Sequence, residues 1–439
     1  MKKLLLLIIA AFTAASFVSA VDFGGNLENY SLITNEDDSQ EQTNKLSLWL
    51  GITPTETMYI KGQGSVAYSL DEYDILADLD YLYITQDFPE IFNERSAFTY
   101  KAGRFFQSDF TGKVFAHRLD GALFSLALPA ANITLGAGYS GLMLKPVSSI
   151  NNTAADIVDD SDDDVTLAPK KIIANLGVSL IDVIPSQQLN ISLVTQLDMR
   201  SDDLLEDGDT SDDDGRGGKL NTYYLGAGMS GAITGSIIYD TYLYLQMGKT
   251  LSLIDGSDYE DKSILAFLGG GSLSYLNRDF YFSKVTASIL YASGDDDNTS
   301  IYEGNTDGNS SQFVPLTTSS TGLFFSPTPS NLLKGGLEYS LKPFADSKTM
   351  LKNFQASLGG GVFFKTSEGA VSEARVAAGS DKNYMGTEAV LTLNFRPVSD
   401  FGVTLSGGAF FPNSSSDGPV AEDLNDTVIG GMLNASFSF

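Results

Sequence analysis

The sequence predicts an all-β protein, a single antiparallel up-and-down β-barrel of about 18 strands that crosses a membrane. Three observations lead to this fold class. Apolar and polar residues alternate with a period of two along most of the chain after residue 20. Most alternating segments have about ten to fifteen residues, which exceeds the usual strand of soluble sheets and suits a tilted strand in a bilayer. The connections alternate between short and long, as in outer-membrane barrels.

The alternation is clear at the C-terminus. Leu433, Phe437 and Phe439 fall on one face of a strand, and Asn434 and Ser436 fall on the other. Outer-membrane barrels commonly end in an aromatic residue on such a strand. We therefore expect the barrel assembly machinery of the outer membrane to recognise the segment that ends at Phe439, and outer-membrane lipid to surround the barrel.

The individual strands follow from the alternating segments. Eighteen strands are expected, at 22–33, 44–53, 57–70, 74–87, 96–106, 117–128, 132–143, 171–181, 188–200, 220–230, 235–248, 262–276, 279–293, 331–343, 352–366, 383–396, 399–411 and 426–439. An even count puts both termini on the side of the short turns, which faces the periplasm. The connection 71–73 is short where a long outer loop is expected. If the strands beside it are misassigned, the count falls to sixteen.

Two soluble folds compete with the membrane barrel. A large β-sandwich would also give alternating strands, but it does not require long and short loops to alternate. A β-helix would show a fixed short repeat, which this sequence lacks. The membrane barrel therefore explains more of the pattern than either alternative.

The N-terminus resembles an export signal. Lys2 and Lys3 precede an apolar run over 4–12, and small residues end the segment at Ala20. This order of basic, apolar and small residues is typical of a secretory signal peptide. We expect a signal peptide at 1–20 and the transmembrane barrel at 21–439. The alternative is an N-terminal membrane anchor, for which the apolar run is short.

Composition excludes several classes of protein. The chain has 55 Asp and Glu residues against 27 Lys and Arg residues, and its formal net charge is −28. Such a chain is poorly suited to nucleic acid, which needs basic patches. The absence of Cys rules out disulfides and thiolate sites, and a single His rules out a site with several His ligands.

Most of the negative charge falls in the predicted outer connections, which hold 36 of the acidic and 8 of the basic residues. These connections are 34–43, 71–73, 107–116, 144–170, 201–219, 249–261, 294–330, 367–382 and 412–425. The wall is therefore nearly neutral, and we expect an anionic rim on the cell-facing side that attracts cations.

One acidic run suggests weak Ca²⁺ binding, because Ca²⁺ takes six to eight oxygen ligands. The candidate ligands are Asp207, Asp209, Asp212, Asp213 and Asp214. The run does not match an EF-hand loop, since its sixth position is Asp212 where that loop has Gly. The alternative is a solvated acidic loop. No other cofactor is expected.

Charged residues within strands should face the lumen, because they are costly against lipid. Taking the apolar face as outward, the pore-lining candidates are Lys61, Asp78, Asp80, Lys101, Lys284, Lys334, Glu338, Lys365, Glu388 and Arg396. As a set they favour a water-filled interior of mixed charge. The alternative is that individual members form salt bridges that stiffen the wall.

A constriction is expected where the loop 107–116 folds into the bore. The candidates are Arg104, Asp109, Arg118 and Asp120. By strict alternation Arg104 would face lipid. A bulge at Gly103, or a position above the lipid, would resolve this conflict.

Several segments resemble the alginate-export-type porins of bacterial outer membranes. The chain carries GTEAVLTLN at 386–394 and FGVTLSGGAFFP at 401–412, which are similar to the closing strands of that family. It also carries YASGDDD at 291–297, Gly-Arg at 103–104 and RLDG at 118–121. The resemblance implies an eighteen-stranded barrel. The exporter members have strongly basic lumens for an anionic polysaccharide, whereas the inward charges here are mixed, so a more general porin is expected.

The leading hypothesis is a bacterial outer-membrane porin through which small hydrophilic solutes diffuse passively. The alternative is a surface barrel that acts through its acidic loops as an adhesin or a cation-binding platform. A barrel enzyme is the third reading, but it would have only His117 as a base. The sequence carries no signal for the oligomeric state.

Overall fold

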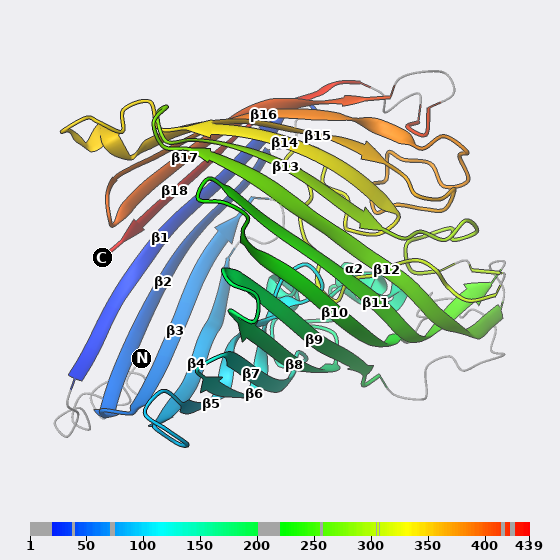
Figure 1. Cartoon of the computed structure of the whole chain (residues 1–439). Coiled ribbons are helices and arrows are strands. Elements are labelled where there is room, and N and C mark those ends of the chain that lie inside the picture. Colours follow the sequence, from blue (N-terminus) through cyan, green and yellow to red (C-terminus); the bar gives the residue numbers. More distant parts are fainter. Residues whose placement is uncertain are drawn as a thin grey trace.

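A closed antiparallel barrel is the architecture of the chain. The computed structural model describes residues 20–36, 40–70, 75–200, 220–254, 258–303, 305–306, 308–413, 418–421 and 426–439. Within them eighteen strands form one sheet, each pairing with its neighbours in sequence (Figure 1). The sheet closes because β1 pairs with β18 as well as with β2. Closure leaves no strand edge exposed.

The strands have the following bounds: β1 (Ala20–Thr34), β2 (Gln40–Thr55), β3 (Met58–Ser69), β4 (Leu76–Pro89), β5 (Ala97–Ser108), β6 (Ala116–Leu128), β7 (Ala131–Tyr139), β8 (Lys171–Ile181), β9 (Gln187–Asp198), β10 (Leu220–Ala232), β11 (Ile237–Ile254), β12 (Asp258–Asn277), β13 (Ser283–Ala292), β14 (Leu332–Leu341), β15 (Phe354–Phe364), β16 (Tyr384–Val398), β17 (Phe401–Pro412) and β18 (Val428–Ser438). Short helices interrupt the connections: η2 (Lys145–Val147), α2 (Ala154–Ser161) and η3 (Met350–Asn353).

The predicted barrel of eighteen strands is confirmed, and the sixteen-strand alternative is wrong. β3 and β4 are separate strands that pair from Met58 opposite Gln86 to Ala67 opposite Leu76. The expected signal peptide lies outside the described residues except for Ala20, so its cleavage stays a prediction.

The expected outer connection 249–261 is the largest error. Most of it is strand, because β11 and β12 stay paired up to Ile254 opposite Asp258. Charged residues of the two strands interact diagonally: Lys249 is opposite Ser263, and its Nζ lies 3.6 Å from an oxygen of Asp261. The two-residue turn expected at 277–278 is longer than predicted, since β13 begins only at Ser283.

The two faces of the wall differ as alternation predicts. Leu48 in β2, Leu243 in β11 and Leu337 in β14 are 54%, 57% and 62% exposed on the outer surface. Ser47, on the inner face of β2, is 4% exposed. No helix among the described residues has the length and apolar character needed to span a membrane, a finding that leaves strand-crossing proteins aside.

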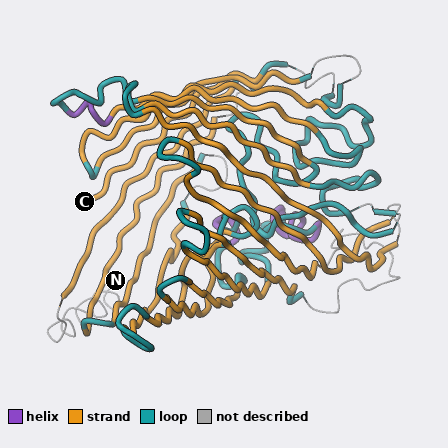
Figure 2. The backbone as a smooth tube through the Cα atoms, in the orientation of Figure 1, coloured by secondary structure: helices purple, strands orange, loops and turns teal. Residues whose placement is uncertain are grey.

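The hydrophobic core lies inside the barrel. Three connections fold into the space that the wall encloses (Figure 2). They are 109–115, 140–170 and 293–331. Val114 and Phe313 from these loops are 0% exposed, and they belong to one buried cluster with Tyr244 of β11. The loops therefore fill part of the bore instead of projecting from it.

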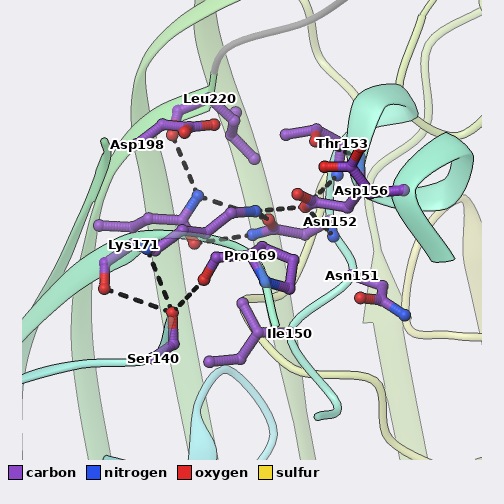
Figure 3. Close-up of polar contacts among 12 residues, drawn as sticks. Ser140, Ile150, Asn151, Asn152, Thr153, Asp156, Pro169, Lys171, Asp198 and Leu220 are labelled. Carbon is purple, nitrogen blue, oxygen red and sulfur yellow. Dashed lines mark hydrogen bonds and ion pairs between the residues drawn. The ribbon is translucent and has the colours of Figure 1, made fainter. Parts of the chain in front are cut away.

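The loop 140–170 is attached to the wall by buried charges (Figure 3). Its helix α2 is capped by Thr153, whose hydroxyl accepts from the N–H of Asp156 while the Asp156 carboxylate accepts from the N–H of Thr153. Asp156 also pairs with Lys171 of β8 and with Arg200. Lys171 is 0% exposed and Asp156 is 1% exposed. This cluster of charges therefore joins the loop to the wall at a place that solvent does not reach.

Candidate functional site

The space left inside the barrel holds several polar cavities. We call the one of about 430 Å³ the lysine cavity, which is lined by Lys113, Asp240, Tyr242, Ser288 and Lys334 among others. It adjoins a second cavity of about 520 Å³ through the shared residues Ser288, Ser320, Thr321 and Lys334. We call the third, of about 530 Å³, the tryptophan cavity; it is lined by Glu28, Trp49, Lys61, Asp80, Tyr81 and Arg118 among others.

The lysine cavity lies between two inward loops and the wall. Lys113 of the loop 109–115 has its Nζ 5.8 Å from the centre of the Tyr242 ring. Lys334 of β14 has its Nζ 5.2 Å from the centre of the Phe363 ring, and it donates to the carbonyl of Thr321. Serine and threonine hydroxyls and the carboxylate of Asp240 line much of the rest, so the cavity presents two ammonium groups against one carboxylate.

Asp109 holds the loop 109–115 across the bore. Its carboxylate accepts hydrogen bonds from the backbone N–H groups of Thr111, Gly112, Val114 and Phe115. It also accepts from the hydroxyl of Tyr244 on β11 at 2.6 Å. The predicted constriction residue thus shapes the loop and fastens it to a distant strand of the wall.

Glu388 of β16 fastens the loop 293–331 to the wall in a similar way. One of its oxygens accepts from the backbone N–H groups of Leu323, Phe324 and Phe325 at 2.9, 2.6 and 3.2 Å. Glu388 is 5% exposed. This carboxylate borders the second cavity, but its main contacts are with the loop that narrows the bore.

The backbone pairing of the wall is interrupted between β4 and β5. Their backbone pairing runs from Pro89 opposite Ala97 to Leu82 opposite Arg104 and then stops, although both strands continue. At this point Gly103 has φ +121°, a conformation that L side chains rarely adopt. A Cβ there would lie 2.1 Å from the carbonyl oxygen of Leu82. The hairpin of β5 and β6 therefore bends away from β4 at a glycine.

Ion pairs bridge the separated strands beyond that bend. Arg118 of β6 lies 2.9 Å from Asp78 and 2.8 Å from Asp80, both on β4. Arg104 pairs with Asp120 at 2.8 Å and donates to the carbonyl of Leu79. The bulge expected at Gly103 is wrong, because β5 pairs through that residue without a register shift, and Gly103 supplies a bend instead. A bulge does occur in β4, opposite Gln63 and Gly64. Arg104 is 8% exposed, so it lies away from lipid despite its place in the alternation.

The remaining pore-lining candidates lie in different surroundings. Lys61 and Lys101 lie over aromatic rings, and Glu338 borders the second cavity. Lys284 sits opposite Ser340 of β14, and Arg396 lies beside Gly402 of β17.

Lys365 differs from this set, because it follows the end of β15 and is 2% exposed. Its ammonium group donates to three carbonyls of the loop 365–383. It therefore holds this loop in place and does not face an open lumen.

The remaining candidates are His117 and the predicted Ca²⁺ ligands. His117 is 6% exposed, and its Nδ1 lies 3.1 Å from the hydroxyl of Ser149. The Ca²⁺ candidates Asp207, Asp209, Asp212, Asp213 and Asp214 lie outside the described residues. Among the residues that the structure describes, no group of three or more His, Asp or Glu side chains is placed to hold a metal ion.

Sequence reasoning missed two residues that border the cavities, Lys113 and Trp49. Lys113 is the sole basic residue in the predicted inward loop 107–116, and Trp49 is the sole tryptophan of the chain. Trp49 occupies a polar-face position in an alternating strand. That exception to the pattern was the available signal.

The loop 293–331 contains a carboxyl group that should respond to pH. Burial raises the pKa of Glu303 from 4.5 to about 7. The packed loop therefore favours the neutral acid, so its stability is fully present below about pH 4.5 and is lost as the pH rises through 7. We expect hydrogen exchange at 299–303 to show more opening at pH 8 than at pH 5 after correction for intrinsic rates. Glu303→Gln should remove this difference; an unchanged difference would contradict the assignment.

Comparison with known proteins identifies the fold. No family model matches the chain, and no curated protein matches it. Solved structures from Pseudomonas aeruginosa do match. The outer membrane protein OpdK is 11% identical with a TM-score of 0.57, covering 96% of this chain and 100% of its own. OccK2 (OpdF), solved in complex with glucuronate, is 12% identical with a TM-score of 0.57, covering 96% and 99%. OccK5 (OpdH) is 12% identical with a TM-score of 0.55, covering 96% and 99%.

This likeness extends over nearly the whole length of both chains. At such identities it establishes a shared fold and no closer relationship. The narrower resemblance to alginate-export-type porins gains no support from these neighbours. The chain has the closed 18-stranded antiparallel barrel fold of these Pseudomonas outer-membrane proteins.

Proposed function

We propose that the chain is a bacterial outer-membrane porin through which small hydrophilic solutes diffuse passively. The observation that carries this proposal is the contrast between the two faces of a closed wall. Leucines cover the outside, whereas charged and hydroxyl-bearing residues border cavities of about 430 to 530 Å³ inside. Such a barrel is stable in lipid and offers polar solutes a wet interior.

The two ammonium groups of the lysine cavity favour small anionic solutes at the narrow part of the bore. Lys113 comes from an inward loop and Lys334 from the wall, so a solute that enters the cavity passes near both. OccK2, a barrel of the same fold, was solved in complex with glucuronate, which is a small hydrophilic carboxylate. This supports the proposal of a similar solute here.

Planar-bilayer recording tests the channel function. Purified refolded protein should give discrete conductance steps. Folding should be verified beforehand by the heat-dependent mobility shift that barrels show in gels. A folded barrel without conductance steps would refute the proposal.

Removing Lys334 should weaken the preference for anions. Lys334→Ala deletes one charge near the path, and an interaction of about 1 kcal/mol in water corresponds to roughly fivefold in the permeability ratio. The reversal potential under a KCl gradient measures this ratio. Lys348→Ala is the matched control, since Lys348 is exposed in the turn between β14 and β15, whereas Lys334 lies near the opposite end of β14. Equal shifts in both variants would show that the lysine cavity does not filter ions.

Insertion into outer-membrane lipid, recognition by the assembly machinery through Phe439 and cleavage of residues 1–20 complete the proposal. The alternative role as an adhesin or cation-binding platform depends largely on the acidic segment 201–219, which lies outside the described residues. It stays a prediction from sequence.

A further inference from the structure

Aromatic rings gather on one inward patch of the wall. We call this the aromatic strip; it consists of Trp49 of β2, Tyr59 of β3, Tyr81 and Tyr83 of β4, and Phe105 of β5. The Tyr83 ring centre lies 6.5 Å from that of Tyr59 and 6.4 Å from those of Tyr81 and Phe105. Inward positions of a water-filled barrel are usually polar, so five neighbouring aromatic residues are an exception that calls for a reason.

Two glycines let the rings lie against the wall. A Cβ at Gly24 of β1 would lie 2.8 Å from Cζ2 of Trp49, so the indole rests directly on that backbone. A Cβ at Gly51 would lie 2.5 Å from the hydroxyl oxygen of Tyr59. The indole therefore packs against the glycine backbone, and Trp49 also lines the tryptophan cavity.

Two lysines accompany the strip. Lys61 Nζ lies 5.8 Å from the Trp49 ring centre and 5.1 Å from that of Tyr81. Lys101 Nζ lies 4.9 Å from the Tyr83 ring centre. Neither lysine belongs to an ion pair among the described residues, so both keep donors for a solute. The strip therefore combines flat apolar faces with hydrogen-bond donors.

The tryptophan cavity beside the strip supplies donors and acceptors together. Lys45, Lys61 and Arg118 donate, the carboxylates of Glu28 and Asp80 accept, and the amide of Gln63 does both. Asp80 already accepts from Lys45, Gln63 and Arg118. A carboxylate solute would meet two repelling carboxylates there, and a cation would meet three basic groups. Hydroxyl groups both donate and accept, so a solute rich in hydroxyls suits this lining best. The volume of about 530 Å³ is typical of a small-ligand site.

We propose that the aromatic strip and the tryptophan cavity form a saccharide-binding subsite on the solute path. A pyranose ring has an apolar face that stacks on an aromatic ring, and hydroxyls at its edge that match mixed donors and acceptors. Trp49 and Tyr81 provide the stacking surface, and Lys61 with Gln63 and Glu28 provide the polar contacts. This inference deepens the proposed porin function, since it rests on the lumen as a solute path and names a second class of solute.

Tryptophan fluorescence tests the subsite directly, because Trp49 is the only tryptophan in the chain. Maltose added to the refolded barrel should change the emission in a saturable manner. Tyr81→Ala and Lys61→Met, each with a folded barrel, should raise the maltose Kd by roughly fivefold or more. Tyr275→Ala is the matched control, since this tyrosine is 51% exposed; its titration should equal that of the unmodified protein. Equal Kd values in all variants would overturn the subsite.

A second readout separates this inference from the porin function. Maltose should interrupt the single-channel current, and Trp49→Ala should abolish the interruptions while conductance persists. A conducting barrel with neither an emission change nor current interruptions refutes the subsite and leaves the porin function intact. Emission changes without conductance support the subsite and refute the porin function. If benzoate or glucuronate displaces maltose at a lower concentration than glucose, the subsite selects carboxylates and the saccharide assignment is wrong.

Discussion

Asp156→Ala is expected to destabilise the attachment of the loop 140–170 to the wall by about 3–5 kcal/mol, the usual cost of removing one partner from a buried ion pair. The variant leaves Lys171, which is 0% exposed, without its carboxylate partner from the loop. It also removes the acceptor for the N–H groups of Asn152 and Thr153 at the start of α2. Limited proteolysis of the folded barrel in detergent should therefore cut within 150–165 much faster than in the unmodified protein.

Two further variants make this result specific. Asp160→Ala removes an exposed carboxylate from the same helix, so it should leave the cleavage rate unchanged. Asp156→Leu combined with Lys171→Met removes the two most deeply buried charges together and should restore much of the loss, because replacing a buried pair costs less than breaking it. Equal protease resistance of Asp156→Ala and Asp160→Ala would show that the buried cluster does not hold the loop.

Glu388→Ala is expected to release part of the loop 293–331 and to raise the single-channel conductance. The substitution strands the backbone N–H groups of Leu323, Phe324 and Phe325 in a buried site. Leaving a buried donor unsatisfied costs about 1–3 kcal/mol, so three donors are expected to open this segment and widen the second cavity. Bilayer recording should show larger and noisier steps, and hydrogen exchange at 322–326 should accelerate.

Glu388→Gln separates the hydrogen bonds from the charge. Its amide oxygen still accepts from the loop, so conductance should stay close to that of the unmodified barrel. The lost negative charge near Lys334 should instead shift the reversal potential toward anion preference. A conductance rise of the same size in the glutamine variant would argue that charge, and not loop anchoring, sets the width of the bore.

The number of strands and their order could be predicted from sequence because both depend on local alternation. Side chains along a strand change face at every residue, and lipid tolerates no unpaired backbone, so eighteen alternating segments have few other arrangements. The strand pairing around Lys249 and Asp261 was not predicted. In a linear sequence, charged residues that form ion pairs across two strands resemble the charged residues of a loop. Pairing partners, unlike periodicity, are not visible locally.

The candidate site was less predictable, because its residues act on loops as well as on solutes. Asp109 and Glu388 were identified as charged positions of interest, but their partners are backbone N–H groups that no sequence pattern marks. Strict alternation would place Arg104 against lipid. That environment is wrong, because the hairpin bends at a glycine. Trp49 carries no charge and so escaped a search that was based on inward charges.

Beyond Leu82 and Arg104 the backbone pairing of β4 with β5 stops, so the contact between these strands depends on the ionic strength. Elsewhere in the wall, neighbouring strands are joined by backbone hydrogen bonds between neutral amide groups. Here cohesion depends on the ion pairs of Arg118 with Asp78 and Asp80, which high ionic strength screens. At high salt, unfolding of this barrel should therefore begin with the separation of β4 from β5.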